Sequence, residues 1–347
     1  MSNIDKLLQK SSYNQLLITN TKMIQYFTSN FYEVGERFIG LAIRENLQPV
    51  LILNSLFMKP KGIDVLYYKD GDSITNIIQS IFHDKTLGVD GTMQASFLIP
   101  LIDKYSIVDI SPLLHSIRNI KDVDEQKKMI NASFQNDAVM TSLTKHFQVG
   151  ITEIELANIA LKMQSTHPMT GPSFEPIVLF GENSWDPHGV PSNRKLQDGD
   201  MILVDMGGMV EGYASDMTRC FFTSENSKLK EIYEIVLQAN LAAIEKVSVG
   251  LPLKDVDKAA RDIIANAGYG DYFVHRTGHG IGIEAHETLD VSSVNETIIE
   301  EGMCFSIEPG IYIEGLGGVR IEDLVLVRDG KALVLNQYPK EIKIINV

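Results

Sequence analysis

Residues 201–222, MILVDMGGMVEGYASDMTRCFF, have the pattern of two apolar strands joined by a tight turn near Glu211. A turn centred just before Glu211 would place Asp205 directly opposite Asp216, about 5 Å away on the same face of the hairpin. A shift of the turn by one step would make the two acids diagonal neighbours. Because the flanking residues are apolar, both carboxylates are expected to be buried, where they need a cation or a shared proton.

A second stretch repeats this arrangement. Residues 304–327, CFSIEPGIYIEGLGGVRIEDLVLV, predict another hairpin, with Gly315 inside a glycine-rich turn. That turn places Glu308 opposite Glu322 on two apolar strands. The sequence therefore contains two pairs of opposed acids.

Histidines lie between the two hairpins. The stretch 272–287, YFVHRTGHGIGIEAHE, holds three of the eight histidines of the chain, and His188 lies in the sequence PHGVP. A single histidine here would be interpreted as a core residue, but three beside two acid pairs favour a functional site. The glycines of this stretch allow close approach of the backbone. Their spacing is wrong for a dinucleotide loop, and His286-Glu287 is not followed by the second histidine of a thermolysin-type zinc motif.

Four carboxylates and an imidazole form an oxygen-rich set of ligands. Such a set suits Mn²⁺ or Co²⁺ better than the nitrogen and sulfur ligands of structural zinc do. Four acids also carry enough charge for two divalent ions about 3.5–4 Å apart, the arrangement used in two-metal hydrolysis. The pattern therefore indicates a dinuclear hydrolytic centre.

The N-terminal third contains no comparable cluster. Short apolar runs at 15–19 and 49–53 predict strands, and 74–82 predicts a helix. Residues 1–118 are therefore expected to form an α/β domain. Residues 119–347 are expected to form a second, α+β domain that carries the site.

The second domain is expected to begin with a long helix. Asp122 and Glu125 have the spacing of a capping box, which marks the start of a helix. Ile130, Phe134 and Ala138 share one face of this helix, as in an amphipathic helix. The helix is expected to end near 149–150.

One pattern occurs twice in residues 119–347. A long helix leads to Val-Gly at 149–150 and again at 249–250, and each time a second helix and strand-rich sequence follow. The second helix of the first copy has its own capping box, Thr152 with Glu155. The repetition predicts a duplicated α+β half, and the alternative is chance similarity between amphipathic helices.

Composition narrows the class of protein. A net charge of −14 over 347 residues disfavours nucleic acid and anionic membranes as partners. Cys220 and Cys304 form no CxxC pair, which excludes a thiolate zinc site and suits a reducing compartment. The first residues lack a signal-peptide pattern, and no apolar run reaches the length of a membrane span. We expect a cytoplasmic protein.

The motifs resemble those of the M24 family of pita-bread metallopeptidases. They are HGVP (188–191), GDMILVDMG (199–207), YASDMTR (213–219), HRTGHGIGIEAHE (275–287) and EPGIYI with GGVRIED (308–323). The similarity is greatest to bacterial X-Pro dipeptidases (prolidases), with aminopeptidase P next. It runs from about residue 120 to the end, and the N-terminal part resembles the creatinase-type domain of these enzymes.

The resemblance implies a role for each candidate residue. Two divalent ions, with Mn²⁺ expected and Co²⁺ or Zn²⁺ as alternatives, would have these ligands: Asp205, Asp216, His279, Glu308 and Glu322. Asp216 and Glu322 would bridge the ions, and Glu308 would also carry the proton of the attacking water. His188, His275 and His286 would position the peptide, with His188 and His286 also assisting catalysis. Arg320 would orient ligands or substrate, and the resemblance also implies a homodimer.

One departure and several alternatives remain. Asp290 stands where the family often has an aliphatic or basic residue, and an acid there would disfavour a nearby substrate carboxylate. The substrate is expected to be a small peptide with proline after the scissile bond, and an X-Pro dipeptide first of all. The alternatives are aminopeptidase P, methionine aminopeptidase, and a non-peptidase pita-bread protein, of the binding or creatinase-like kind. The last group typically lacks metal ligands.

Overall fold

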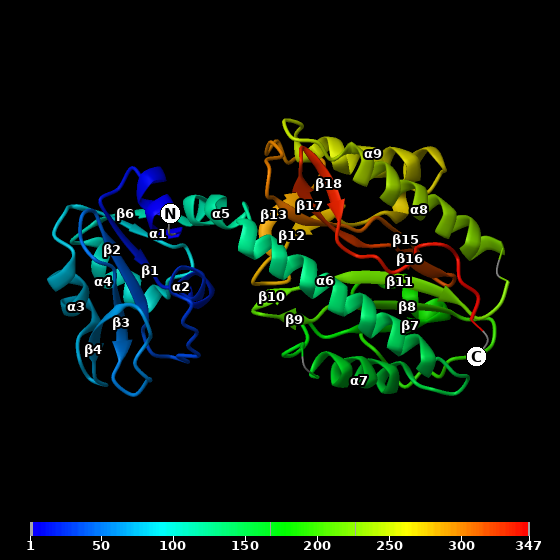
Figure 1. Ribbon diagram of the computed structural model, residues 1–347, viewed down its shortest axis with the longest axis horizontal. Helices are drawn as coiled ribbons and strands as arrows, with labels where there is room; N and C mark the ends of the chain where they lie inside the picture. The colour runs from blue at the N-terminus through cyan, green and yellow to red at the C-terminus, as the bar shows by residue number, and fades with distance from the viewer. Residues whose placement is uncertain (1–2, 167, 226, 346–347) are drawn as a thin grey trace. The chain divides into compact units, whose positions relative to one another are not determined.

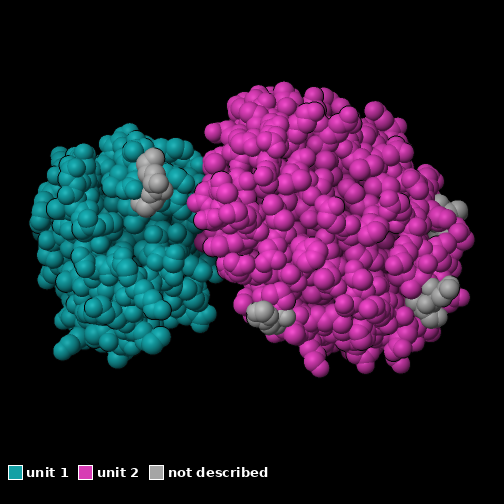
Figure 2. All heavy atoms as spheres, viewed as in Figure 1, with its two compact units in different colours: residues 1–118 teal, residues 119–347 magenta. Residues whose placement is uncertain are grey.

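The structure is a computed structural model that describes residues 3–166, 168–225 and 227–345. The chain divides into two compact units, residues 1–118 and 119–347, coloured separately in Figure 2. Within the described residues, no helix combines the length and the apolar character needed to cross a membrane.

Unit 1 is built on a mixed six-stranded sheet with the strand order β4-β3-β2-β1-β5-β6. Its strands are β1 (Gln15–Ile18), β2 (Gly40–Arg44), β3 (Val50–Asn54), β4 (Asp64–Tyr68), β5 (Thr86–Val89) and β6 (Ser106–Asp109). Its helices are α1 (Asn3–Lys10), α2 (Thr21–Thr28), α3 (Ile74–Ile81), α4 (Ala95–Ile102) and α5 (Ser111–Arg118). The predicted strands at 15–19 and 49–53 and the helix at 74–82 are confirmed as β1, β3 and α3. Because β1 is buried along its whole length, the sheet separates two apolar cores.

Unit 2 contains the remaining elements. Its helices are α6 (Val123–Leu143), α7 (Glu153–Gln164), α8 (Ser227–Lys246) and α9 (Leu253–Asn266). Its first group of strands is β7 (Ile177–Phe180), β8 (Met201–Met206), β9 (Met209–Val210), β10 (Tyr213–Ala214) and β11 (Met217–Phe222). Its second group is β12 (Gly278–Gly280), β13 (Glu287–Val291), β14 (Cys304–Ile307), β15 (Gly310–Ile313), β16 (Gly317–Arg320), β17 (Asp323–Arg328) and β18 (Lys331–Val334).

The two groups of strands repeat one architecture. A helix pair precedes each group, α6 with α7 and α8 with α9, and Figure 1 shows α7 on one side of the strands and α8 and α9 on the other. Gly150 and Gly250, which stand between the helices of each pair, have the same left-handed φ of 92° and 91°. Since only glycine adopts this conformation without strain, the repeated Val-Gly marks the same turn twice. The predicted duplicated α+β fold is confirmed.

The starts of α6 and α7 were predicted correctly, but the end of α6 and its buried face were not. Both capping boxes are present, Asp122 with Glu125 and Thr152 with Glu155. The first long helix ends at Leu143, earlier than expected. Phe134 is 63% exposed, so the expected apolar face is not the buried one.

Helix α6 buries a partly polar face instead. This face consists of Met129, Ala132, Ser133, Asn136, Asp137 and Met140. Asn136 Nδ2 donates to Met206 O at 2.9 Å and Gln337 N to Asp137 Oδ2 at 2.7 Å. Asn136 and Asp137 are tolerated in the interior because each bonds to a backbone group of a neighbouring segment.

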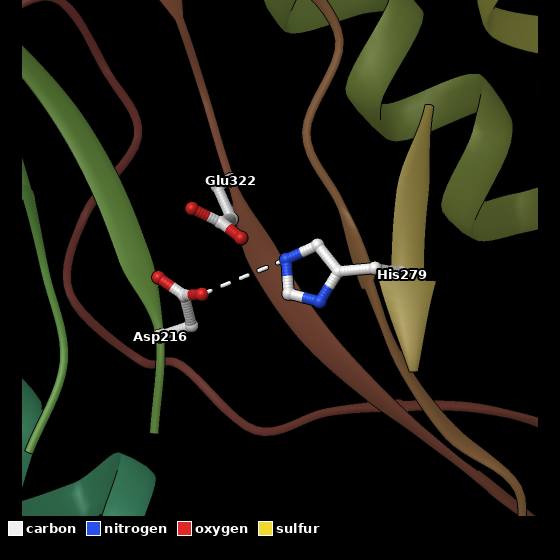
Figure 3. A group of neighbouring side chains, drawn as sticks. All are labelled: Asp216, His279 and Glu322. Atoms are coloured by element: carbon white, nitrogen blue, oxygen red, sulfur yellow. Dashed lines mark ion pairs between the residues drawn. The ribbon is translucent and has the colours of Figure 1, made fainter. Parts of the chain in front are cut away.

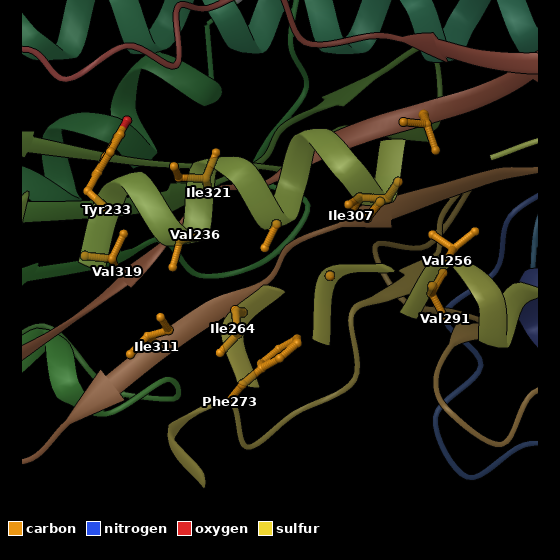
Figure 4. Packing of buried hydrophobic residues seen from close by; sticks show 14 of the residues in the cluster. Tyr233, Val236, Val256, Ile264, Phe273, Val291, Ile307, Ile311, Val319 and Ile321 are labelled. Carbon is orange, nitrogen blue, oxygen red and sulfur yellow. The ribbon is translucent and has the colours of Figure 1, made fainter. Parts of the chain in front are cut away.

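A large apolar core lies between α8, α9 and the second group of strands. Figure 4 shows Tyr233 and Val236 of α8 and Ile264 of α9 among the side chains of this core. Ile307 and Ile321, each one residue away from a candidate site acid, are fully buried in the same core. The core therefore fixes the strand ends that carry Glu308 and Glu322.

The first hairpin has a different register from the one expected. Its turn is formed by Glu211 and Gly212, both with positive φ, and Val210 pairs with Tyr213. This register places Thr218 opposite Asp205, so Asp216 is a diagonal neighbour of Asp205. The prediction that Asp205 and Asp216 lie directly opposite each other is therefore wrong. The alternative, a turn shifted by one step, is the one that occurs.

The second hairpin has the expected register. Ile307 pairs with Asp323 and Gly310 with Arg320, so Glu308 and Glu322 lie opposite each other between these pairs. Gly315 adopts a positive φ of 77° in the turn. The position of the glycine-rich turn was enough to predict this pairing.

Candidate metal centre

The predicted site residues come together around one cavity of about 300 Å³ in unit 2. The residues that line it are Phe174, Ile177, Pro187, His188, Asp205, Asp216, His275, Arg276, His279, His286, Glu308, Arg320 and Glu322. They come from both halves of the duplicated fold, although more than one hundred residues separate Asp205 from Glu322. Every residue for which a site role was predicted lines this cavity.

Three side chains form the centre of the cluster. Asp216, His279 and Glu322 are buried, and one potential ligand atom from each lies within 4.8 Å of the others (Figure 3). His279 Nε2 lies 3.7 Å from Asp216 Oδ2 and 3.4 Å from Glu308 Oε1. A single ion between these atoms would have oxygen and nitrogen ligands on several sides, so the group can hold a divalent metal.

Hydrogen bonds to backbone and side chains hold the imidazole and one acid in place. Ser306 Oγ donates to Glu308 Oε1 at 3.1 Å and accepts from His279 N at 3.0 Å. His279 Nδ1 lies 3.1 Å from Gly280 O, which can only accept. The proton of His279 is therefore on Nδ1, and the lone pair of Nε2 faces the carboxylates, as a metal ligand requires.

Arg320 connects Asp205 to the second hairpin. Its Nη2 donates to Asp205 Oδ2 at 2.5 Å and its Nε to Thr218 Oγ1 at 3.0 Å, and Thr218 Oγ1 donates to Glu322 Oε2 at 2.9 Å. Its Nη1 donates to Tyr312 Oη at 2.8 Å. Arg320 is buried, so its contact with Asp205 is not a surface ion pair. It fixes the orientation of two of the acids.

The carboxylates have the electrostatics expected of a cation site. Burial, together with the carboxylates of Glu322 and Asp205, raises the pKa of Asp216 well above its usual value. Burial and Glu308 do the same to the pKa of Glu322. Among the described residues, no hydrogen-bond donor reaches Asp205 Oδ1, Asp216 Oδ1 or Glu322 Oε1.

Three buried carboxylate oxygens without partners are costly unless a cation compensates them. Hard oxygen donors with one imidazole are the ligand chemistry of divalent ions such as Mn²⁺. The residues present therefore fit a divalent metal.

The other three histidines have different surroundings. His286 is exposed, its ring lies 4.0 Å from that of His279, and burial of its inner face with the nearby His279 lowers its pKa to about 4. His188 is exposed in the segment after Pro187. His275 Nδ1 lies 2.7 Å from Arg276 O and its Nε2 2.9 Å from Tyr312 Oη. All three line the cavity, but both nitrogens of His275 are engaged within the protein, whereas His188 and His286 are exposed.

Asp290, the acid that departs from the family pattern, is bonded to neighbouring side chains. Its Oδ1 accepts from Asn295 Nδ2 at 2.7 Å and from Ser292 Oγ at 3.3 Å. Asp290 is also not among the residues that line the cavity. Its carboxylate is therefore bonded within its own turn, and its effect on a substrate carboxylate stays a prediction.

Three uncharged polar residues that hold the site residues had no assigned role in the sequence analysis. Thr218, Ser306 and Tyr312 hold Glu322, Glu308 and Arg320 through the hydrogen bonds described above. The register of the first hairpin would have revealed Thr218, since it stands opposite Asp205. Ser306 is two residues from Glu308, and Tyr312 is two residues from Gly310, the cross-strand partner of Arg320. Alternation along a strand places such neighbours on one face.

Comparison with known proteins gives the same assignment. Residues 127–329 match metallopeptidase family M24, and residues 1–120 match the creatinase/prolidase N-terminal domain. An uncharacterized peptidase of Staphylococcus aureus strain USA300 is 35% identical over 351 residues, covering 98% of this chain and 100% of the relative.

Two solved structures are similar to this chain in fold and in sequence. A dipeptidase from Pyrococcus horikoshii OT3 has a TM-score of 0.93 at 36% identity, covering 99% of this chain and 100% of its own. A prolidase from Thermococcus sibiricus has a TM-score of 0.92 at 35% identity, covering 99% and 98%. With the pita-bread fold, the acid and histidine cluster and these matches together, the chain belongs to metallopeptidase family M24.

Proposed function

We propose that this metallopeptidase hydrolyses X-Pro dipeptides with two divalent ions, Mn²⁺ first of all. The observation that carries the proposal is the cluster of buried acids whose oxygens lack donors, set around the Nε2 atom of His279. One ion would have Asp205 among its ligands and the other His279 and Glu308, with Asp216 and Glu322 shared between them. The charge of four carboxylates suits two such ions better than one.

The chain itself supplies orientation and proton transfer. Bound divalent ions would polarise the scissile carbonyl and lower the pKa of the attacking water. The Glu308 carboxylate, oriented by Ser306, would take the proton of that water and pass it to the proline nitrogen that leaves. His188 and His286, at the cavity, would hold the peptide and donate to the oxygen on which negative charge develops.

The proline of an X-Pro dipeptide carries the free C-terminal carboxylate of the substrate. A site for such dipeptides needs a cationic group to bind this carboxylate. Three of the five N–H donors of Arg320 are engaged by Asp205, Thr218 and Tyr312, and its charge is paired with that of Asp205. Arg276 lines the same cavity and is exposed. We assign the substrate carboxylate to Arg276, and Asp290, which is bonded to Ser292 and Asn295, does not line the cavity. The two solved structures named above carry the names dipeptidase and prolidase, which supports the assignment.

Comparison of Leu-Pro with Leu-Pro-Gly-Gly under identical metal loading tests the proposal. A dipeptidase is expected to prefer Leu-Pro by more than about tenfold in kcat/KM, because the longer peptide moves its carboxylate away from the cation. Equal or faster cleavage of the tetrapeptide would assign the enzyme to aminopeptidase P. Full activity after exhaustive chelation would refute the metal mechanism.

Sedimentation at working concentration tests the homodimer, which we propose from the family resemblance alone.

A further inference from the structure

A buried ion pair lies beside the cavity and is not explained by metal binding. Lys121 Nζ lies 2.8 Å from Glu287 Oε2, and the two side chains are only 2% and 3% exposed. Isolated charges are costly in the protein interior, so both must be held by specific partners. Lys121 is not a residue that lines the cavity, and neither is Glu287. Glu287 directly follows His286, which does line it.

The Glu287 carboxylate organises the loop that carries His286. Its second oxygen, Oε1, accepts from Ile283 N at 3.0 Å. A Cβ atom at Gly282 would clash with this carboxylate, so the backbone is packed directly against it. Gly282 O in turn accepts from Ala214 N at 2.7 Å, two residues before Asp216. The carboxylate is thus the inner support of the turn between β12 and β13.

The backbone of Lys121 is itself held in place by hydrogen bonds. Its N–H donates to Gly302 O at 2.8 Å, and its carbonyl accepts from Gln126 Nε2 at 2.9 Å. The neighbouring Ile120 forms a bridge with Met303, next to β14. The ammonium group therefore starts from a backbone anchored against the sheet of the second half, before α6 begins.

We infer that Lys121 and Glu287 form a positioning pair for His286. The anchored ammonium holds the carboxylate, the carboxylate holds the backbone of the turn, and the turn sets the His286 ring against His279. The inference rests on the role proposed above for His286 in substrate handling. It assigns no contact with substrate or metal to either member of the pair.

A double-mutant cycle tests whether the pair acts through His286. Lys121→Met is expected to lower kcat/KM about 10- to 100-fold, as is usual for residues that orient active-site groups, with metal content unchanged. His286→Ala alone is expected to cost about 10²-fold. If Lys121 works through His286, the double variant will lie within about threefold of His286→Ala, because coupled residues are not additive. Effects that multiply to about 10³-fold or more would overturn the inference.

Glu287→Gln provides a second variant in case Lys121→Met does not fold. Glutamine keeps the shape and the acceptor for Ile283 N but removes the charge, so it should show the same non-additivity with His286→Ala. Arg194→Met is the matched control. Arg194 forms a partly buried ion pair with Asp200, with 2.6 Å between Nη1 and Oδ2, and it does not line the cavity that contains His286. Its effect should combine additively with that of His286→Ala.

A spectroscopic measurement separates this inference from the proposed substrate. In protein with labelled histidine and loaded with diamagnetic Zn²⁺, the adjacent ring of His279 should shift the ring protons of His286. That shift should be lost in both Lys121→Met and Glu287→Gln and retained in Arg194→Met. An unchanged His286 signal in both charge variants would overturn the positioning role. Failure of the wild type to cleave X-Pro peptides would refute the proposed function and leave this result standing.

Discussion

The imidazole of His286 lies against that of His279, with 4.0 Å between ring centroids and 39° between ring planes. The two rings nevertheless face different groups. His279 Nε2 is directed at the carboxylates of Asp216 and Glu308, whereas His286 is exposed at the cavity. Adjacent histidines in one site are therefore expected to have separate functions.

Substitution of the two rings should separate metal binding from turnover. His286→Ala is expected to retain the metal and lower kcat/KM by about 10²-fold, the cost typical of a donor to a developing oxyanion. His279→Ala is expected to lose metal as well as activity. Elemental analysis and steady-state kinetics on both variants measure the difference. Loss of metal from His286→Ala would show that the division of roles is wrong.

Asp216→Asn should weaken metal binding without unfolding the protein. The amide removes a charge that we assign to both ions, and it replaces a carboxylate whose pKa is raised by burial and by the neighbouring acids Glu322 and Asp205. We expect the metal-free variant to be at least as stable as the metal-free wild type, and its metal affinity to fall more than about tenfold, which is at least 1.4 kcal/mol. Asp290→Asn is the control, because Asp290 is bonded within its own turn. Two ions per chain in Asp216→Asn, measured by elemental analysis after dialysis, would contradict the assignment.

The two hairpins show which parts of the site the sequence could predict. Glycine-rich turn chemistry positioned Gly315, and the pairing of Glu308 with Glu322 followed from it. In the first hairpin Glu211 adopts a left-handed φ of 51°, which a glutamate rarely does, so the turn could not be placed to the residue. The predicted face of each side chain was nevertheless correct. The true partner of Asp205 is Thr218, which is two positions from Asp216 and therefore on the same face of the strand.

Long-range polar contacts were beyond the reach of sequence patterns. The buried face of α6 includes Asn136 and Asp137, whose partners Met206 and Gln337 come from distant segments. An apolar periodicity therefore selected Phe134, which the fold exposes. The ion pair of Lys121 with Glu287 spans 166 residues and leaves no local pattern.

Arg276→Gln tests the assignment of the substrate carboxylate. A charge-assisted hydrogen bond contributes about 1.5–3 kcal/mol, so kcat/KM for Leu-Pro should fall by about 10- to 100-fold. The amide of the same substrate, Leu-Pro-NH₂, lacks the carboxylate and should be cleaved about equally by variant and wild type. Arg328→Gln, an exposed arginine at the end of β17, should change neither rate. Equal losses for Leu-Pro and its amide would assign Arg276 to another role.

The two capping boxes of unit 2 place equivalent glutamates in opposite environments. Glu125 accepts from Asp122 N at 2.9 Å and from Tyr213 Oη at 3.0 Å, and its burial raises its pKa. Glu155 accepts from Thr152 N at 2.8 Å on the surface, and this bond lowers its pKa. Glutamine fits either box, since its carbonyl oxygen can accept the same backbone N–H.

Glu125→Gln and Glu155→Gln should therefore change stability with opposite dependence on pH. A raised folded-state pKa means that the folded protein binds the proton more tightly, so the contribution of Glu125 to stability is lost as pH rises from about 4.3, the unfolded value, through the folded one. Glu125→Gln should then become more stable relative to the wild type between pH 4 and 8. Glu155 contributes stability above its unfolded pKa and loses it as pH falls through its lowered folded value, so Glu155→Gln should become less stable relative to the wild type as pH rises to about 5 and change little above that. Urea unfolding of metal-free protein at several pH values measures both trends, and parallel slopes for the two variants would contradict the expected difference in burial.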